Sequence, residues 1–281
     1  MSSTVLTVGG GTGSYEPPVR NVTVVESSAV MWAHRLPTGL RGRTRVIHRG
    51  ECCVRADPDD VGDYLITARS FDEYRAMFAL TGSDLSGSVL DCPGGGSSFT
   101  ALANQAGASA IAADPVYAQP REPLAALVRA ELQRGRAHTA AGADRYVWDF
   151  YGDLGGHTRV RRKSAEAFSR DLIAHPARYV PASLPALPFP DGRFDLVLSS
   201  HFLFTYADRL DLEFHRAALR ELRRVARHQV RVFPLLEQGG RPVPVLLSQL
   251  LATLGIPHRI RRVGYEFQRG GNEMLVLNAT Q

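Results

Sequence analysis

The chain has 281 residues, of which 44% are hydrophobic and 22% are charged, and this composition is typical of a globular protein with a sizeable core. Its apolar runs fall short of the roughly 20 residues that a membrane-spanning helix needs. The N-terminus lacks the basic segment and the apolar run of an export signal. These features argue against a membrane protein and predict a cytoplasmic location.

The formal net charge of +5 raises the possibility of a nucleic-acid partner. However, Lys163 is the only lysine, and the arginines are spread along the chain instead of forming a basic tail, which argues against nucleic acid. Cys52, Cys53 and Cys92 lack the paired spacing and the nearby histidines of a zinc site, and adjacent cysteines rarely bridge each other. The sequence therefore predicts neither a metal site nor a disulfide framework.

Residues 1–60 are expected to form a partial Rossmann-like segment. A strand at 5–8, a glycine turn at 9–13 and a second strand at 22–26 follow one another, and the second strand ends in Glu26. A third strand is expected at 44–48, before a linker at 57–60. Residues 61–281 then form the predicted main domain.

The main domain begins with a predicted helix over residues 70–80. Ser70 is the expected N-cap, and Glu73 at the third helical position completes a capping box. A strand at 88–91, a glycine turn, a helix at 98–105 and a strand at 109–113 come next. These elements predict a complete βαβ unit.

The next connection, residues 116–176, is longer than an ordinary crossover. It has helical patterns at 123–134 and 161–174 around an aromatic stretch at 146–151. We expect a helical lid insertion over a pocket, and the alternative is a helical subdomain with its own core. As a lid it would contact the substrate together with the aromatic residues after a later strand, so the candidate substrate-binding residues are Trp148, Asp149, Tyr151 and Tyr206.

The rest of the chain alternates strands and helices. Strands are predicted at 178–182, 194–200 and 229–235, helices at 213–227 and 243–254, and two closing strands at 258–267 and 273–278. The closing strands are joined across Gly270 and Gly271, which favours a hairpin. This order predicts an α/β fold with a mostly parallel sheet and a C-terminal antiparallel hairpin.

The turn after residue 91 and the acid at residue 114 predict a ligand site. Glycines let the backbone approach a ligand closely, and the following helix N-terminus presents free N–H groups. Asp114 ends the next strand, where a carboxylate can accept hydrogen bonds from ribose hydroxyls. The alternative is an ordinary tight loop, but turn and acid together favour a nucleotide-like ligand.

Two ordered motifs in these elements resemble those of class I S-adenosylmethionine (SAM)-dependent methyltransferases. Residues 90–99, Leu-Asp-Cys-Pro-Gly-Gly-Gly-Ser-Ser-Phe, resemble their first motif, and residues 187–200 resemble the fourth-strand motif of the type 11 members. Pro93 and Ser97 replace the first and third glycines of that first motif. The resemblance covers about residues 69–277 and implies a Rossmann-like methyltransferase fold, SAM as cofactor and methyl transfer to a small molecule.

The resemblance also implies roles for individual residues. Asp91 and the turn would approach the methionine part of SAM, Asp114 the ribose and the segment after the third strand the adenine. Arg69 and Tyr74 are further candidates, because a guanidinium binds a carboxylate through paired hydrogen bonds. The expected cofactor-binding residues are Arg69, Tyr74, Asp91, Pro93, Gly94, Gly95, Gly96, Asp114, Pro115, Ser183, Leu184, Ser199 and Ser200.

His201, after the fourth strand of the main domain, is the candidate general base. An unperturbed histidine pKa near 6.5 suits proton removal at neutral pH. The alternative is a histidine that only hydrogen-bonds the cofactor or a backbone carbonyl.

The N-terminal glycine unit also resembles the first motif, with Glu26 as its ribose acid, but Thr7 stands where the first acid belongs. No fourth-strand motif follows it before the second unit begins, so the unit is interpreted as a truncated copy. We expect it to pack on the main domain or to form a homodimer through an unpaired sheet edge.

Two rival functions stay open. A non-catalytic SAM-binding or regulatory protein is compatible with the altered first motif. A nicotinamide-dependent oxidoreductase would need a G-x-G-x-x-G pattern, which residues 93–98 lack and residues 9–14 leave incomplete.

Overall fold

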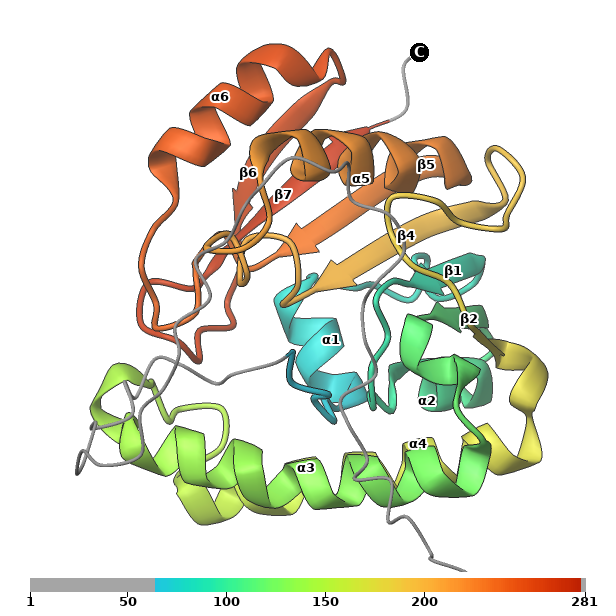
Figure 1. Cartoon of the computed structure of the whole chain (residues 1–281), viewed down its shortest axis with the longest axis vertical. Coiled ribbons are helices and arrows are strands. Elements are labelled where there is room, and N and C mark those ends of the chain that lie inside the picture. Colours follow the sequence, from blue (N-terminus) through green and yellow to red (C-terminus); the bar gives the residue numbers. More distant parts are fainter. Residues whose placement is uncertain (1–63, 279–281) are drawn as a thin grey trace, which may run out of the picture. The chain divides into compact units, whose positions relative to one another are not determined.

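A computed structural model describes residues 64–278, so the predictions for residues 1–60, including Cys52 and Cys53, lie outside the described residues. The described chain forms a seven-stranded sheet in the order β3-β2-β1-β4-β5-β7-β6 (Figure 1). Strands β1 to β5 are parallel to one another, whereas β7 is antiparallel to both β5 and β6. The predicted α/β fold, with its mostly parallel sheet and antiparallel C-terminal pair, is confirmed.

The strands of the sheet are β1 Ser88–Asp91, β2 Ser109–Ala113, β3 Tyr179–Val180, β4 Phe194–Ser200, β5 Ala226–Phe233, β6 His258–Arg262 and β7 Glu273–Asn278. The α-helices are α1 Phe71–Met77, α2 Phe99–Gln105, α3 Arg121–Ala141, α4 Leu154–Ala174, α5 Leu212–Val225 and α6 Pro244–Leu254. Three short 3-10 helices are η1 Pro115–Ala118, η2 Ala143–Arg145 and η3 Pro176–Arg178. None of the described helices is both long and apolar enough to cross a bilayer.

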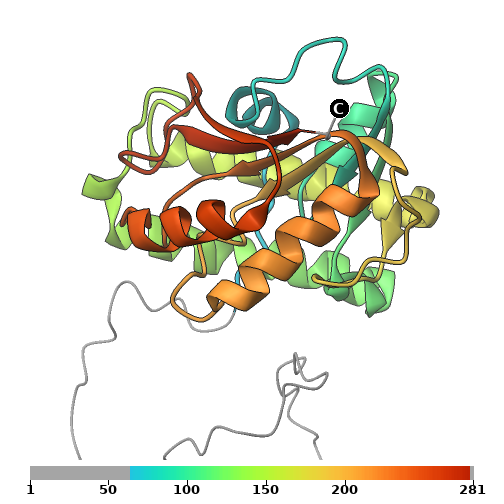
Figure 2. The same cartoon turned by 90° about the horizontal axis from the view of Figure 1, so that it is seen from above.

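Helices cover both faces of the sheet because successive strand residues point to opposite sides. Val89 of β1 lies in a core cluster with Tyr74 of α1 and Phe99 of α2. Leu90 lies in another cluster, with side chains of α5 and α6 such as Leu222. Figure 2 shows α5 and α6 on one face of the sheet and α1 on the other. Side chains of β1 are therefore buried on both faces of the sheet, directly before the turn that follows Asp91.

The capping box at the start of α1 is confirmed. Ser70 Oγ accepts a hydrogen bond from the backbone N–H of Glu73 at 3.2 Å, and Glu73 Oε2 accepts one from the backbone N–H of Ser70 at 2.8 Å. This pair satisfies two N–H groups that would otherwise lack partners at the helix N-terminus. The helix itself is shorter than predicted and ends at Met77.

The insertion between β2 and β3 contains the two longest described helices, α3 and α4; the predicted bounds of α3 and the predicted start of α4 are wrong, and the predicted end of α4 at residue 174 is confirmed. α3 runs on through Gly135 to Ala141. α4 begins at Leu154, because Asp153 caps it by accepting a hydrogen bond from the backbone N–H of Gly156 at 2.6 Å. The helices pack against each other, and α4 also contacts α2. The role of this insertion as a lid stays a prediction.

Three predicted strands also have wrong bounds. β3 has only two residues because Pro181 follows it, and proline has no N–H to donate to a neighbouring strand. β5 begins at Ala226, which pairs with Phe194 of β4, and it ends before Pro234. β6 ends at Arg262 instead of Phe267.

Candidate active site

The carboxyl ends of β1, β2, β4 and β5 meet along one edge of the sheet. Asp91 of β1 pairs in register with Leu198 of β4, and Ser200 at the end of β4 pairs with Phe233 of β5. The strand order reverses direction here, because β2 lies on one side of β1 and β4 on the other. In open α/β sheets ligands bind at such a switch point. We take this edge as the candidate site.

The glycine turn after β1 is fixed by close packing. A Cβ on Gly94 would lie 2.5 Å from Tyr117 Oη and 2.8 Å from Ala112 Cβ, and a Cβ on Gly96 would lie 2.7 Å from a methyl of Val128. Gly95 has a φ of 52°, which favours glycine. Close packing therefore leaves no room for a side chain at Gly94 or Gly96, and the backbone conformation of Gly95 favours glycine. The sequence motif alone does not show this.

Asp114 holds the turn from the neighbouring strand. Its Oδ2 accepts a hydrogen bond from the backbone N–H of Gly95 at 2.9 Å, and its Oδ1 accepts one from Val116 at 3.0 Å. Tyr117 Oη donates to the carbonyl of Gly95 at 2.8 Å. Burial raises the pKa of Asp114 to about 6, although both backbone hydrogen bonds act to lower it. The carboxylate therefore braces the turn and retains spare lone pairs for a ligand.

Asp91 is buried and only half satisfied. Its Oδ1 accepts a hydrogen bond from Tyr74 Oη at 2.9 Å, and its Oδ2 has no hydrogen-bond partner among the described residues. Burial raises the pKa of Asp91 well above its usual value, the bond from Tyr74 opposes this, and the nearby charge of Asp114 adds to it. A cationic donor at Oδ2 would relieve the burial penalty of the carboxylate.

Two more buried polar atoms at this edge lack hydrogen-bond partners within the part of the chain that the structure describes. They are Nη1 of Arg69, which precedes α1, and Oγ of Ser199, which follows the β4 residue paired with Asp91. The charge of Arg69 acts on the pKa of Tyr74 and of His201, which places the guanidinium at the same edge. The unsatisfied nitrogen of Arg69 can pair with a ligand carboxylate and the unsatisfied oxygen of Asp91 with a ligand cation, so the two groups match a zwitterion such as an amino acid.

His201 follows β4 in a left-handed backbone conformation, with a φ of 48°. Its backbone N–H donates to the carbonyl of Phe233 at 2.7 Å, and its Nδ1 lies 2.9 Å from Ser200 Oγ. Burial lowers the pKa of His201 well below 6.5, and the positive charges of Arg69 and Arg161 lower it further. The ring is therefore neutral at pH 7 and is a weak base.

The predicted adenine-contacting residues, Ser183 and Leu184, differ in exposure. Ser183 is exposed and forms a bridge with Ala186, whereas Leu184 is buried with Cys92 and Ala113 of the first two strand ends. Leu184 therefore belongs to the core cluster that contains the ends of β1 and β2, whereas Ser183 lies at the surface. Pro93 is partly buried in the turn, and Pro115 begins η1 directly after Asp114.

The predicted substrate-binding residues do not form one group. Tyr206 packs edge-on against Tyr64, with ring centroids 4.6 Å apart, and its Oη accepts a hydrogen bond from the backbone N–H of Leu65 at 3.0 Å. Trp148 lies against Phe267, 5.7 Å between centroids, and Asp149 is exposed. The hydroxyl of Tyr151 lies in a buried cluster around the carboxylate of Glu73. Their roles toward a substrate stay predictions.

That buried cluster contains residues that the sequence did not single out for function. Arg161 of α4 donates to Glu73 Oε2, and Tyr265, beyond β6, lies 2.8 Å from Tyr151 between hydroxyl oxygens. Burial acts to raise the pKa of Glu73, but the charge of Arg161 and its hydrogen bond lower it to about 2. Only the capping box marked Glu73 in the sequence, and nothing marked Arg161 or Tyr265.

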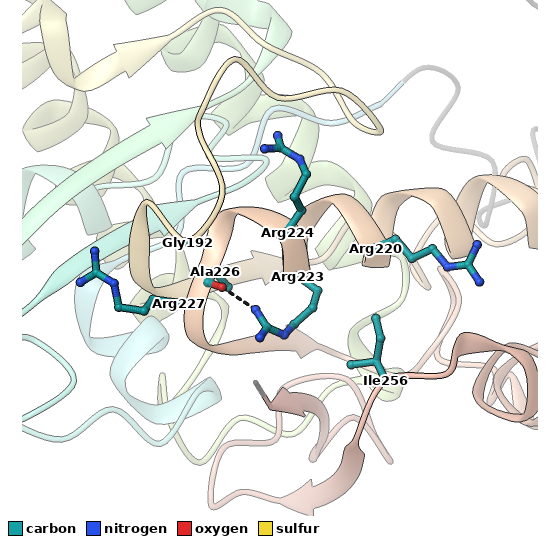
Figure 3. A pocket seen from close by; sticks show the side chains of 7 residues that line it. All are labelled: Gly192, Arg220, Arg223, Arg224, Ala226, Arg227 and Ile256. Carbon is teal, nitrogen blue, oxygen red and sulfur yellow. Dashed lines mark hydrogen bonds between the residues drawn. The ribbon is translucent and has the colours of Figure 1, made fainter. Parts of the chain in front are cut away.

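A shallow cavity of about 480 Å³ lies elsewhere, between the C-terminal end of α5 and the start of β5. It is lined by Gly192, Arg220, Arg223, Arg224, Ala226, Arg227 and Ile256, and its arginine side chains point in different directions (Figure 3). Arg224 is paired with Asp191 and Glu221, and Arg227 with Asp195. Because β5 begins here, the cavity lies at the sheet edge opposite the candidate site.

Residues 156–233 match a protein family described as a methyltransferase domain. The match runs from α4 to the end of β5 and includes the motif at 187–200, but not the glycine turn. An uncharacterized protein of Methanocaldococcus jannaschii is 28% identical over 216 residues, which are 76% of this chain and 96% of the relative.

Similar solved structures have low sequence identity. A putative SAM-dependent methyltransferase of Methanococcus maripaludis is 11% identical, with 75% of this chain and 84% of that chain covered and a TM-score of 0.39. A SAM-dependent methyltransferase of Aquifex aeolicus is 13% identical, with 80% and 100% covered and a TM-score of 0.38. The magnesium protoporphyrin IX methyltransferase of Synechocystis, with bound SAM, is 12% identical, with 81% and 100% covered and a TM-score of 0.38.

The matched segment contains the motif at 187–200, which resembles the fourth-strand motif of SAM-dependent methyltransferases. Residues 156–233 are thus similar to a methyltransferase domain, as the resemblance of the sequence motifs implies.

Proposed function

We propose that the chain transfers a methyl group from SAM to a small-molecule acceptor at the carboxyl edge of β1 and β4. The observation that carries this proposal is the pair of unsatisfied buried groups, Asp91 Oδ2 and Arg69 Nη1. Their opposite charges suit the ammonium and carboxylate of the methionine part of SAM. Asp114 would hold the ribose hydroxyls while it keeps the turn in place.

SAM supplies a methyl group that is already activated on a sulfonium, so the protein mainly orients the acceptor and removes a proton where one is lost. His201, beside Ser199 and Ser200, is the proposed base. Because its pKa is held well below 6.5, it favours an acceptor that is ionised when it binds, such as a carboxylate. Methyl transfer to such an acceptor releases no proton, so a weak base at this position suffices.

Two observations support a small acceptor. Tyr64, Phe202 and Tyr206 form an aromatic group just beyond β4, with centroid distances from Tyr64 of 6.0 Å to Phe202 and 4.6 Å to Tyr206. This group would suit an apolar or planar molecule. The arginine-lined cavity lies at the opposite sheet edge, so its positive charge does not lead a nucleic acid to the site.

Titration calorimetry of the full chain with SAM, S-adenosylhomocysteine and NADH tests the function. We expect both adenosyl amino acids to bind and NADH to give no heat. Binding of NADH alone would support the oxidoreductase. SAM binding without methyl transfer to any member of a panel of small acids and phenols would support a non-catalytic SAM-binding protein.

Asp91→Asn is expected to weaken SAM binding by roughly 10- to 100-fold, because a charged hydrogen bond to the SAM ammonium contributes about 1.5–3 kcal/mol. The amide can still accept the hydrogen bond from Tyr74, so the fold should persist. Calorimetry measures the change, and Asp72→Asn, at an exposed site on α1, is the control. Equal SAM affinity in the two variants would remove Asp91 from the site.

The affinity for 5′-methylthioadenosine, which lacks the amino-acid part of SAM, is expected to fall about tenfold per pH unit below pH 6. Protonation of Asp114, whose pKa is about 6, removes an acceptor for the ribose hydroxyls. Asp91 has no ammonium to meet in this ligand, so the profile reports on Asp114. Calorimetry between pH 5 and 8 measures it, and a flat profile would contradict the role of Asp114.

Protonation of Asp114, which is expected to weaken ligand binding, is expected to stabilise the ligand-free protein. Folding raises the pKa of Asp114 from its ordinary value of 3.8 to about 6, so the folded state holds the proton more tightly than the unfolded state. The contribution of Asp114 to the free energy of unfolding is therefore present below the lower pKa. It is lost as the pH rises through the higher one.

A further inference from the structure

Glu73 is the centre of a buried cluster that joins segments far apart in the sequence. Its Oε1 accepts hydrogen bonds from Tyr151 Oη at 2.5 Å and Tyr265 Oη at 3.4 Å. Its Oε2 accepts from the backbone N–H of Ser70 at 2.8 Å and from Nη1 of Arg161. A carboxylate offers about four acceptor positions, and each position on Glu73 faces a donor, with the single hydroxyl hydrogen of Tyr265 shared between Glu73 and the closer Tyr151 Oη.

Arg69 lies beside this filled carboxylate without a hydrogen bond to it. Its Nη1 is 3.6 Å from Glu73 Oε1, which is an electrostatic contact, and this nitrogen is buried without a hydrogen-bond partner among residues 64–278. The buried guanidinium of Arg161 and the largely buried one of Arg69, whose side chain is 12% exposed, therefore share one carboxylate, and one positive charge is left over in the cluster. Because an uncompensated buried charge is costly, the cluster is suited to receive a second carboxylate.

Helix α4 also holds the backbone of Arg69. Ser164 lies three residues after Arg161, on the same face of the helix. Its Oγ donates to the carbonyl of Arg69 at 2.6 Å and accepts from the backbone N–H of Ser98 at 3.1 Å. One face of α4 thus contacts Arg69, the carboxylate beside it and the helix that begins after the glycine turn.

We propose that Arg161 is a positioning residue, which occupies Glu73 and so leaves Arg69 a free guanidinium nitrogen for the carboxylate of the bound adenosyl amino acid. Without Arg161, Arg69 is the cation nearest to Glu73 in this cluster and turns toward it. The helical insertion then acts on cofactor binding through a single side chain. This inference rests on the proposed function.

The test compares S-adenosylhomocysteine with 5′-methylthioadenosine, which shares the adenosine and the thioether but has no carboxylate. Calorimetry on the full chain gives both dissociation constants and their ratio. In Arg161→Met we expect S-adenosylhomocysteine to bind about 10- to 100-fold more weakly, the loss of one charged hydrogen bond, with methylthioadenosine changed less than about twofold. A role in folding alone would weaken both ligands alike.

Three further variants separate positioning from packing. Arg161→Lys keeps a positive charge beside Glu73 and is expected to keep the wild-type ratio of the two dissociation constants. Arg161→Met combined with Glu73→Gln removes the competing carboxylate and is expected to restore the ratio. Arg162→Met, at the exposed neighbouring position on α4, is the control. If Arg161→Met does not fold, Arg161→Gln replaces it with the same expected direction.

An unchanged ratio in Arg161→Met, or a double variant that stays as weak as the single one, would overturn the inference about Arg161. Failure of the proposed function has a different signature. In that case the wild-type chain itself binds neither ligand, or binds both equally.

Discussion

Asp114→Ala is expected to weaken SAM binding about 100-fold. The substitution removes the acceptor for the ribose hydroxyls and leaves the backbone N–H groups of Gly95 and Val116 without their partner. A lost hydrogen bond to a charged group costs roughly 1.5–3 kcal/mol and a 100-fold change is about 2.7 kcal/mol, so the loss of the contact between Asp114 and the ribose accounts for a change of this size. Calorimetry with SAM measures it.

Asp72→Ala is the control for this variant, because Asp72 is exposed on α1 and takes no part in the site. Thermal unfolding of both variants shows how much of the change comes from the turn itself. SAM affinity that is untouched in Asp114→Ala would show that the assignment of the site is wrong.

Gly156→Ala is expected to lower the free energy of unfolding by about 3 kcal/mol or more. A Cβ at this position would lie 1.9 Å from the backbone carbonyl oxygen of Tyr151, which cannot move away without moving the loop. In most helices the same change stabilises the protein by up to about 1 kcal/mol, so the sign is distinctive. Denaturant unfolding measures the loss.

Gly155→Ala is the matched control, one residue earlier in the same helix. Its Cβ would meet only side-chain atoms, the nearest being Asp153 Oδ1 at 3.1 Å. We expect its stability to stay within about 1 kcal/mol of the wild type. Similar losses in both variants would indicate that the approach of the Tyr151 carbonyl is not what requires Gly156.

The parts of the fold that depend on local patterns could be predicted from the sequence. The capping box of Ser70 and Glu73, the strand that ends at Asp91 and the acid at Asp114 all follow from residues that are close together in the chain. The same holds for the parallel sheet, since alternating strands and helices leave few ways to cover both faces. The motif at 187–200 also predicted β4, whose carboxyl end lies at the candidate site.

The parts that depend on distant partners could not be predicted. Arg161 and Tyr265 reach Glu73 from 88 and 192 positions away, and neither has a local pattern that marks it. The start of α4 at Leu154 could not be predicted, because a glycine such as Gly156 usually disfavours a helix. In this protein the close approach of the Tyr151 carbonyl leaves no room for a side chain at Gly156. The start of β5 at Ala226 depends on its pairing with Phe194 of β4, which no local pattern shows.

The most direct test of the site is a crystal structure of the full chain with S-adenosylhomocysteine. The predicted result places the ammonium at Asp91 Oδ2, the carboxylate at Arg69 Nη1 and the ribose hydroxyls at Asp114. A ligand bound elsewhere, for example in the cavity lined by Arg220 and Arg227, or one whose amino-acid group avoids both Asp91 and Arg69, would contradict it.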